Sequence, residues 1–137
     1  MLILIVDDDE SIVRVIGSYL QQAGFTVQAA YDMQMTLALL QKQSFDLMIL
    51  DIMLPDGDGW RIVDSVRADA RLKDLPIVIL SAKIEDSDKI YGLQLGADDY
   101  ITKPFNPQLI VAKVQRILKR IYAHNTPTTL RVGDLEI

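Results

Sequence analysis

The stretch "LILIVDDDES" (residues 2–11) places five aliphatic residues directly before three aspartates and a glutamate. A short, continuously apolar run of this kind predicts a buried strand of a parallel sheet. Such a strand would bring the acidic side chains that follow it to one place. Like charges held that close repel one another, so something must neutralise them. Both the fold and the function depend on what that is.

Four more short apolar runs follow along the chain: "FTVQAA" (25–30), "FDLMIL" (45–50), "LPIVIL" (75–80) and "DYIT" (99–102). Five strand–helix alternations predict a doubly wound α/β fold with five parallel strands and right-handed crossovers. Asp9 is expected to cap the first helix and Gly24 to end it. The apolar faces expected on the helices are, in chain order, Ile12, Val13, Ile16, Tyr19 and Leu20; Met33, Leu37 and Leu40; Ile62, Val63 and Val66; Ile84, Ile90 and Leu93; and Leu109 to Ile121, ending near Tyr122.

The composition is that of a globular protein, with 137 residues, 50% of them hydrophobic, and a net charge of −5. This length suits one domain with the edge of another. The acidic balance argues against nucleic-acid binding by this segment itself, since such binding needs clustered Lys and Arg. Cysteine is absent, and no apolar run approaches the ~18 residues that suggest a membrane span. We therefore expect a cytoplasmic protein without a membrane partner.

Polar side chains stand at the predicted carboxyl ends of the strands: Asp7, Asp8, Asp51, Ser81 and Lys103. In a doubly wound sheet these ends meet at one edge, where ligands bind. Three carboxylates with a backbone carbonyl make an oxygen ligand set suited to Mg²⁺. The lysine and the hydroxyl could hold the oxygens of a phosphoryl group, and an aspartate can accept that group as an acyl phosphate. The set predicts metal-assisted phosphoryl transfer onto a carboxylate.

Each member of this set also has a purely structural interpretation. Asp7 and Asp8 could be solvated charges, and Asp51 could be an ordinary acidic residue at a strand end. The "PDGDG" stretch (55–59) is expected to be a tight loop and not a calcium loop, because no later acidic ligand follows it. Lys103-Pro104 could be only a turn, with a cis bond before the proline. The joint pattern is more specific than any of its members.

Four stretches, "LIVDDDES", "DLMILDIMLPDGDGW", "PIVILSAK" and "GADDYITKPF", together resemble the receiver domain of two-component response regulators. The resemblance covers residues 2 to about 121 and implies the flavodoxin-like (βα)5 fold with strand order 2-1-3-4-5. It implies that Asp51 is phosphorylated by a sensor histidine kinase. It also implies that Asp7, Asp8 and Asp51, with the backbone carbonyl of Met53, hold Mg²⁺, for which Mn²⁺ could substitute.

The same resemblance implies a two-state switch. Lys103 would pair with the phosphate, Ser81 would be the switch hydroxyl, and Tyr100 would be the aromatic switch residue that moves with it. The face formed by the fourth helix, fifth strand and fifth helix would change as a result. Tyr100 could instead be only a half-buried aromatic residue of a strand.

The C-terminal stretch "LRVGDLEI" (130–137) is similar to the opening strands of the winged-helix DNA-binding domain of the OmpR/PhoB class. This similarity implies a receiver domain over residues 1–122, a linker over 123–129 and the start of a truncated DNA-binding domain over 130–137. DNA would then be bound only through the missing domain.

In the OmpR/PhoB class, active receivers form homodimers through the fourth helix, fifth strand and fifth helix, using charge pairs. Asp98 with Lys113 and Asp99 with Arg120 stand at matching positions here. Lys89 matches as well, but its usual glutamate partner falls on Leu109, so one interface pair is absent. These charges could also be an ordinary solvated surface.

Two other functions fit parts of the pattern. A stand-alone receiver would act through protein–protein contacts, and a haloacid-dehalogenase-like phosphatase would use Asp7 as its nucleophile. The phosphatase leaves Asp51 without a role. That family also has its lysine before a pair of acidic residues, whereas Lys103 follows the pair available here, Asp98 and Asp99. Met53 and Lys83, two residues beyond Asp51 and Ser81, cannot orient an attacking water. We therefore expect slow loss of phosphate and no enzymatic turnover.

Overall fold

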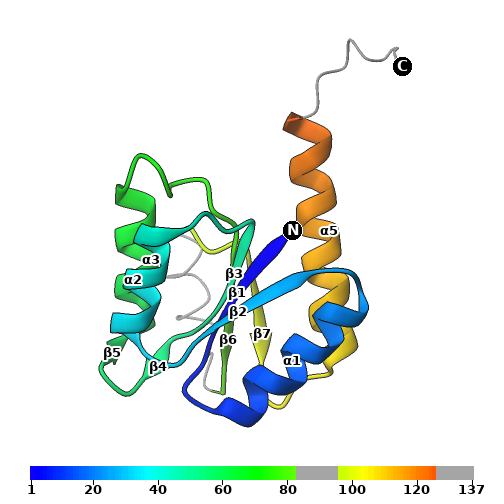
Figure 1. Cartoon of the computed structure of the whole chain (residues 1–137), viewed down its shortest axis with the longest axis horizontal. Coiled ribbons are helices and arrows are strands. Elements are labelled where there is room, and N and C mark those ends of the chain that lie inside the picture. Colours follow the sequence, from blue (N-terminus) through cyan, green and yellow to red (C-terminus); the bar gives the residue numbers. More distant parts are fainter. Residues whose placement is uncertain (83–95, 126–137) are drawn as a thin grey trace.

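The computed structural model describes residues 1–82 and 96–125 of the chain. Five parallel strands form one sheet in the order β2-β1-β3-β6-β7, which is the predicted order 2-1-3-4-5 (Figure 1). These strands are β1 (Leu2–Val6), β2 (Thr26–Ala30), β3 (Leu47–Asp51), β6 (Ile77–Ser81) and β7 (Asp99–Thr102). The helices described are α1 (Glu10–Gln22), α2 (Met33–Lys42), α3 (Gly59–Ala68) and α5 (Pro107–Asn125). The predicted flavodoxin-like fold is confirmed.

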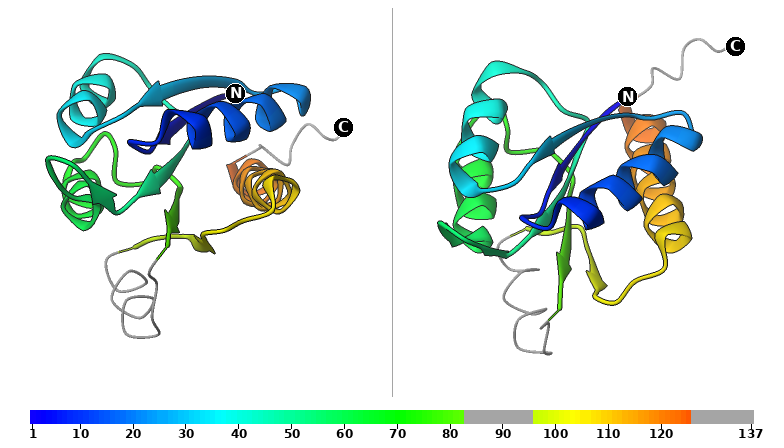
Figure 2. Two further views of the ribbon diagram at one scale, coloured as in Figure 1. Left: turned by 90° about the horizontal axis from the view of Figure 1, so that it is seen from below. Right: turned by 60° about the horizontal axis from the view of Figure 1, so that its bottom comes forward.

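The sheet is covered on both sides, with α1 and α5 on one face and α2 and α3 on the other (Figure 2). Successive strand residues point to opposite faces, so Leu4 and Val6 pack toward α2 and α3 while Ile3 and Ile5 pack toward α1 and α5. Strands buried on both faces need continuous apolar sequence, which explains the unbroken aliphatic runs. None of the helices within the described ranges is both long and apolar enough to cross a bilayer.

The predicted helix boundaries are confirmed around α1. The Asp9 side chain accepts hydrogen bonds from the backbone N–H groups of Ser11 and Ile12, and so caps the helix. Gly24, one residue beyond the C-cap, has a φ of 98°, a left-handed conformation that favours glycine. The chain can therefore turn directly from α1 into β2.

The apolar face predicted for the second helix was partly wrong. Leu37 is 36% exposed, whereas Thr36 and Leu40 are buried, with Met33 and Leu39 packed against the same cluster. Thr36 can be buried because its hydroxyl donates a hydrogen bond to the carbonyl of Asp32, 2.7 Å away, within its own helix. A hydroxyl satisfied in this way cannot be distinguished from an exposed one by sequence.

Several element boundaries differ from the sequence prediction by one to three residues. Helix α5 includes Asn125, three residues into the stretch predicted as a linker. Asp51 and Ser81 are the last residues of their strands rather than the first residues after them. The predicted fourth helix, with Ile84, lies outside the described residues, as does 126–137.

The "PDGDG" stretch forms a tight turn, as predicted. Strands β4 (Met53–Leu54) and β5 (Gly57–Asp58) pair antiparallel, with only Pro55 and Asp56 between them. The resulting hairpin lies directly between Asp51 and the start of α3.

Candidate functional site

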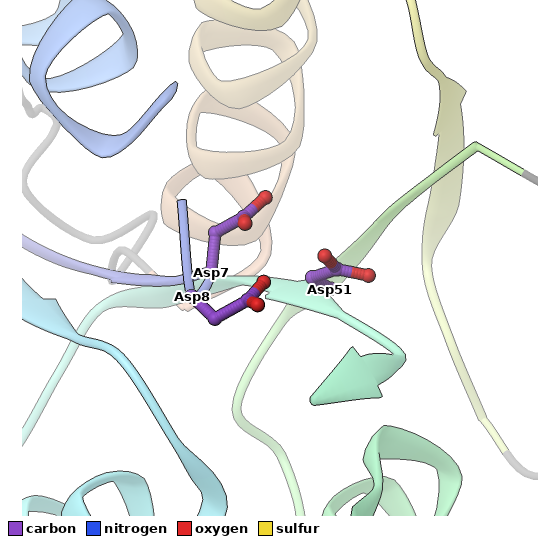
Figure 3. A group of neighbouring side chains, drawn as sticks. All are labelled: Asp7, Asp8 and Asp51. Carbon is purple, nitrogen blue, oxygen red and sulfur yellow. The ribbon is translucent and has the colours of Figure 1, made fainter. Parts of the chain in front are cut away.

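Three carboxylates meet at the carboxyl edge of the sheet, as the sequence predicted (Figure 3). Asp7 and Asp8 follow β1, and Asp51 ends the neighbouring strand β3. One oxygen from each carboxylate lies within 4.8 Å of the others. Asp7 and Asp51 are buried and Asp8 is exposed. The cluster therefore combines two buried acids with one that faces solvent.

Local hydrogen bonds fix the orientation of the two buried carboxylates. Asp7 Oδ1 accepts a hydrogen bond from the Asp9 N–H at 2.9 Å, and Asp51 Oδ1 accepts one from the Met53 N–H, also at 2.9 Å. Both are contacts from an aspartate to the backbone two residues further on, a local turn that aspartate favours. In each residue the second oxygen, Oδ2, remains for the site.

Lys103 joins the two buried acids. Its ammonium Nζ lies 3.0 Å from Asp51 Oδ2 and 2.8 Å from Asp7 Oδ2. Burial by itself would lower the pKa of Lys103, but its interactions with Asp7 and Asp51 outweigh that effect and raise the pKa. The lysine therefore stays protonated and supplies a fixed cation. It comes from the loop after β7, whose Lys103-Pro104 bond is cis, as the sequence suggested.

The site also fits the predicted metal ion. The contact between Lys103 and Asp7 Oδ2 lacks hydrogen-bond geometry, so within the described part of the chain this buried oxygen accepts no hydrogen bond. This oxygen is paired with the Lys103 ammonium at 2.8 Å but has no hydrogen-bond donor among the described residues, so it can also serve as a ligand of a metal ion. Three carboxylates at this spacing supply the hard oxygen ligands that Mg²⁺ and Mn²⁺ prefer. Asp7, Asp8 and Asp51 could hold such an ion, with Met53 as the predicted carbonyl ligand.

The remaining predicted site residues lie on the same sheet. Ser81 is fully buried at the end of β6, beside β3, and its carbonyl accepts a hydrogen bond of 2.9 Å from the Lys103 N–H. Tyr100, in β7, is partly buried against the cluster that covers the α2 and α3 face. Met53 is 58% exposed at the start of the hairpin. The structure therefore brings Ser81 and Lys103 to the acidic edge, with Tyr100 two residues before the carboxyl end of β7.

Three of the predicted interface charges, Asp98, Asp99 and Lys113, have partners within the chain. Asp99 Oδ2 lies 2.8 Å from Lys113 Nζ and 3.0 Å from an Arg116 nitrogen. Asp98 Oδ2 lies 3.2 Å from an Arg67 nitrogen and accepts a hydrogen bond of 2.8 Å from the Ile77 N–H. The pairs expected between two chains, Asp98–Lys113 and Asp99–Arg120, remain predictions.

Of the other interface residues, Arg120 and Leu109 are exposed on α5, with 48% of Leu109 accessible to solvent. Lys89 lies outside the described residues. The surface on which the usual glutamate is replaced by leucine is therefore open.

Two residues that connect separate elements of the fold were not predicted from the sequence. Arg67, in the last turn of α3, donates hydrogen bonds to the carbonyls of Lys73, Leu75 and Gly96. Asp56, at the tip of the hairpin, accepts hydrogen bonds from the first turn of α2. Neither residue has a fixed sequence spacing from its partners. The only sequence signal was that Asp56 stands five residues after Asp51 and so had to lie near the site.

An apolar groove of about 540 Å³ adjoins the site on the side of Lys103. It runs between the start of α1 and the loop before α5, and its wall includes Ile12, Val15 and Phe105. The groove is open to solvent, and Lys103, which contacts Asp7 and Asp51, forms part of its wall. A partner that reaches Asp51 from this side would meet an apolar surface first.

Comparison with known proteins agrees with this geometry. Residues 3–115 match the family model described as the response regulator receiver domain. The chain is 44% identical over 126 residues to the regulatory protein VanRc of Enterococcus gallinarum, a match that covers 92% of this chain and 53% of that protein. It is 39% identical over 133 residues to the phosphate regulon transcriptional regulatory protein PhoB of Pseudomonas aeruginosa, covering 97% and 58%.

The fold is similar to that of solved structures. A two-component response regulator from Clostridium difficile superposes with a TM-score of 0.82 at 32% identity, covering 88% of this chain and 98% of that one. By contrast, the chain spans only about half the length of the curated relatives that it matches. The family model, the sequence identities and the shared fold show that the chain belongs to the response regulator receiver domains of two-component systems.

Proposed function

We propose that the chain accepts a phosphoryl group on Asp51 from the phosphohistidine of a sensor histidine kinase. The observation that carries this proposal is the position of Lys103, which holds the free oxygens of Asp7 and Asp51 together at 2.8 and 3.0 Å. A carboxylate that is oriented by one backbone hydrogen bond and paired with one cation is a positioned nucleophile.

In the transfer step, Asp51 Oδ2 would attack phosphorus while the bond from phosphorus to the histidine nitrogen breaks. The product is an acyl phosphate, and the electron pair of the broken bond stays on the histidine nitrogen, which leaves as neutral imidazole because the other ring nitrogen of the phosphohistidine carries a proton. Lys103, which pairs with the Asp51 carboxylate before the transfer, would then pair with the phosphoryl oxygens. Mg²⁺, held by Asp7, Asp8 and Asp51, would supply further neutralisation of those oxygens.

The phosphorylated state would change the surface of the molecule. Phosphate adds charge and acceptor oxygens at Asp51, one strand away from the buried Ser81. The Ser81 hydroxyl would turn toward these oxygens, and Tyr100 would move with it and alter the face made by β7 and α5 together with the predicted fourth helix. Homodimer formation through this face is the proposed output.

We further propose that the chain is the receiver part of a longer transcription regulator, with residues 1–122 as the receiver domain, 123–129 as the linker and 130–137 as the start of a DNA-binding domain. This proposal is supported by the transcriptional regulator PhoB, of which the matched region covers 58%. DNA would be contacted only by that further domain, and the receiver itself would not turn over as an enzyme.

The test is phosphorylation of the purified chain by acetyl phosphate with Mg²⁺, followed by intact mass measurement. We expect the mass gain of one phosphate, abolished by Asp51→Asn and by removal of Mg²⁺ with a chelator. Catalytic turnover that survives Asp51→Asn but not Asp7→Asn would instead support a phosphatase that uses Asp7. A wild-type chain that gains no phosphate under any of these conditions would refute the proposed function.

A further inference from the structure

The tip of the hairpin that follows Asp51 is bound to the first turn of α2. Asp56 Oδ1 accepts a hydrogen bond of 2.7 Å from the Met33 N–H, and Oδ2 accepts one of 3.1 Å from the Gln34 N–H. The helix also has a cap of its own, because Asp32 accepts a hydrogen bond of 2.7 Å from the Met35 N–H. Capping alone therefore does not require a second carboxylate from 23 residues away.

The base of the hairpin is held by Asp51, the last residue of β3, and by Ile52, which follows it. The Met53 N–H donates to Asp51 Oδ1, and the Gly59 N–H donates to the Ile52 carbonyl at 2.8 Å. Each strand of the hairpin has only two residues, too few to fix its direction by pairing alone. Leu54 is buried, but the Met53 side chain is 58% exposed and contributes little packing. The bidentate contact of Asp56 is thus the polar attachment of the tip in the described part of the chain.

We propose that Asp56 is a positioning residue for metal binding: by attaching the hairpin to α2, it fixes the backbone of Met53 beside the Asp7, Asp8 and Asp51 carboxylates. This inference rests on the proposed function, in which the Met53 carbonyl is a ligand. A carbonyl that is already in place does not have to be ordered when the ion binds, so affinity is gained. Without Asp56, the Met53 carbonyl would have to be ordered when the ion binds, and this cost would lower the affinity for Mg²⁺.

The coupling must also act in the opposite direction. If the attached hairpin favours ion binding, then ion binding favours the attached hairpin by the same factor. The amides of Met33 and Gln34, which belong to α2 and not to the site, would then exchange with solvent more slowly in the presence of Mg²⁺. A residue that only stabilised α2 would not produce this effect.

The experiment measures Mg²⁺ affinity by titration calorimetry in wild type, Asp56→Ala and Asp56→Asn, with Asp32→Ala as the matched control. We expect Asp56→Ala to weaken Mg²⁺ binding by about tenfold, the lower end of the range for groups that orient metal ligands. Asp56→Asn should recover most of the loss, since its amide oxygen can still accept one of the two N–H bonds. Asp32→Ala removes a cap from the same turn but leaves the hairpin attached, so it should bind Mg²⁺ like wild type.

Hydrogen exchange supplies the second readout. Protection of the Met33 and Gln34 amides should increase with Mg²⁺ in wild type and not in Asp51→Asn. Wild-type Mg²⁺ affinity in Asp56→Ala, or an equal loss in Asp32→Ala, would overturn the inference while leaving the proposed function intact. A wild-type chain that binds no Mg²⁺ would contradict the metal site itself, so the two failures are distinguishable.

Discussion

The two buried aspartates divide their oxygens between two tasks. In both Asp7 and Asp51, Oδ1 accepts a backbone hydrogen bond and Oδ2 faces Lys103. Among the described residues the exposed Asp8 carboxylate has no such contact, and it adds negative charge at the rim. Repulsion among the three carboxylates is therefore the source of the expected affinity for a divalent cation.

Substitution of Asp8 tests this account. We expect Mg²⁺ at ten times its dissociation constant to stabilise the wild type by about 1.4 kcal/mol, and to raise its melting temperature by about 5 °C. In Asp8→Asn the increase should be clearly smaller, because one ligand charge is lost. Calorimetric melting with and without Mg²⁺ provides the measurement. Equal increases in the two proteins would show that Asp8 does not contribute to ion binding.

The pKa of Asp56 gives a prediction for pH. The hydrogen bond from the Met33 N–H lowers the pKa of Asp56 below its ordinary value of 3.8, burial opposes this effect, and the hydrogen bond from the Gln34 N–H adds to it. A lowered folded-state pKa means that the unfolded chain binds the proton more tightly. The stabilisation by Asp56 is thus fully present above pH 3.8 and is lost as the pH falls through the folded-state value.

The gap in melting temperature between wild type and Asp56→Ala should therefore be largest near neutral pH and should narrow in acid. Thermal melts of both proteins between about pH 7 and pH 3 give the comparison. If the gap stays constant over this range, the carboxylate charge of Asp56 contributes nothing and only its shape matters.

The residues two positions beyond Asp51 and Ser81 give a prediction about lifetime. Met53 and Lys83 carry no carboxylate or carboxamide that could orient a water for attack on the phosphoryl group. We expect phosphorylated Asp51 to persist for minutes or longer, and Met53→Glu to shorten its life. The phosphate remaining is followed by intact mass after the phosphodonor is removed. A wild-type half-life of seconds would contradict the prediction.

At the scale of elements, the first residue of α3, Gly59, lies directly against the backbone at the end of β3. A Cβ atom at Gly59 would lie 2.5 Å from the Cα of Ile52 and 2.8 Å from the carbonyl oxygen of Asp51. Both neighbours are backbone atoms and cannot move aside as the end of a side chain can. Helix α3 and strand β3 therefore approach each other as closely as they do because residue 59 has no side chain.

Gly59→Ala should consequently destabilise the protein by about 1–3 kcal/mol and slow phosphorylation of Asp51, since the acceptor backbone must shift. The matched control is Gly17→Ala, whose Cβ would meet Val27 at 3.5 Å, an ordinary contact. Urea unfolding and the acetyl phosphate reaction measure the two effects. Equal stability of the two variants would show that the shift at residue 59 is readily absorbed.

Elements were predicted well where one physical rule governs them. Aliphatic runs identified all five strands of the sheet to within two residues, and Asp9 and Gly24 marked the ends of α1. Prediction was wrong where tertiary partners decide the outcome. Thr36 is buried in place of Leu37 because its hydroxyl is satisfied within α2, and Asp56 caps a helix that is distant in sequence. Neither contact leaves a periodic signal.

At the scale of the whole molecule, the acidic edge was predictable because a parallel sheet brings strand ends together. The partners of Asp98 were not. Its hydrogen bonds with Arg67 and the Ile77 N–H connect α3, β6 and the residue before β7, and they depend on the completed fold. Any role of Asp98 between two chains must compete with these contacts.

The proposed dimer gives a prediction at this scale. Leu109 is 48% exposed at the position where the class has a glutamate opposite Lys89. Leu109→Glu should tighten dimerisation of the phosphorylated chain by about two- to fivefold, the effect of one surface ion pair. Sedimentation of the phosphorylated protein at several concentrations is the measurement.

Gln108→Glu is the control, because it adds the same charge to the adjacent exposed position of α5. The same change in both variants would indicate a general effect of charge. Weaker dimerisation of Leu109→Glu would mean that the leucine itself forms the contact.

The site residues come from distant parts of the chain, and this makes phosphorylation dependent on complete folding. Lys103 contacts an aspartate 52 residues earlier in the chain, and Asp7 comes from a third strand. These groups come together only when β1 pairs with β3 and β6 pairs with both β3 and β7, that is, in the finished sheet. The ability to be phosphorylated is thus a report on folding itself. Incompletely folded or damaged molecules would not be phosphorylated, and only correctly folded molecules would transmit the signal.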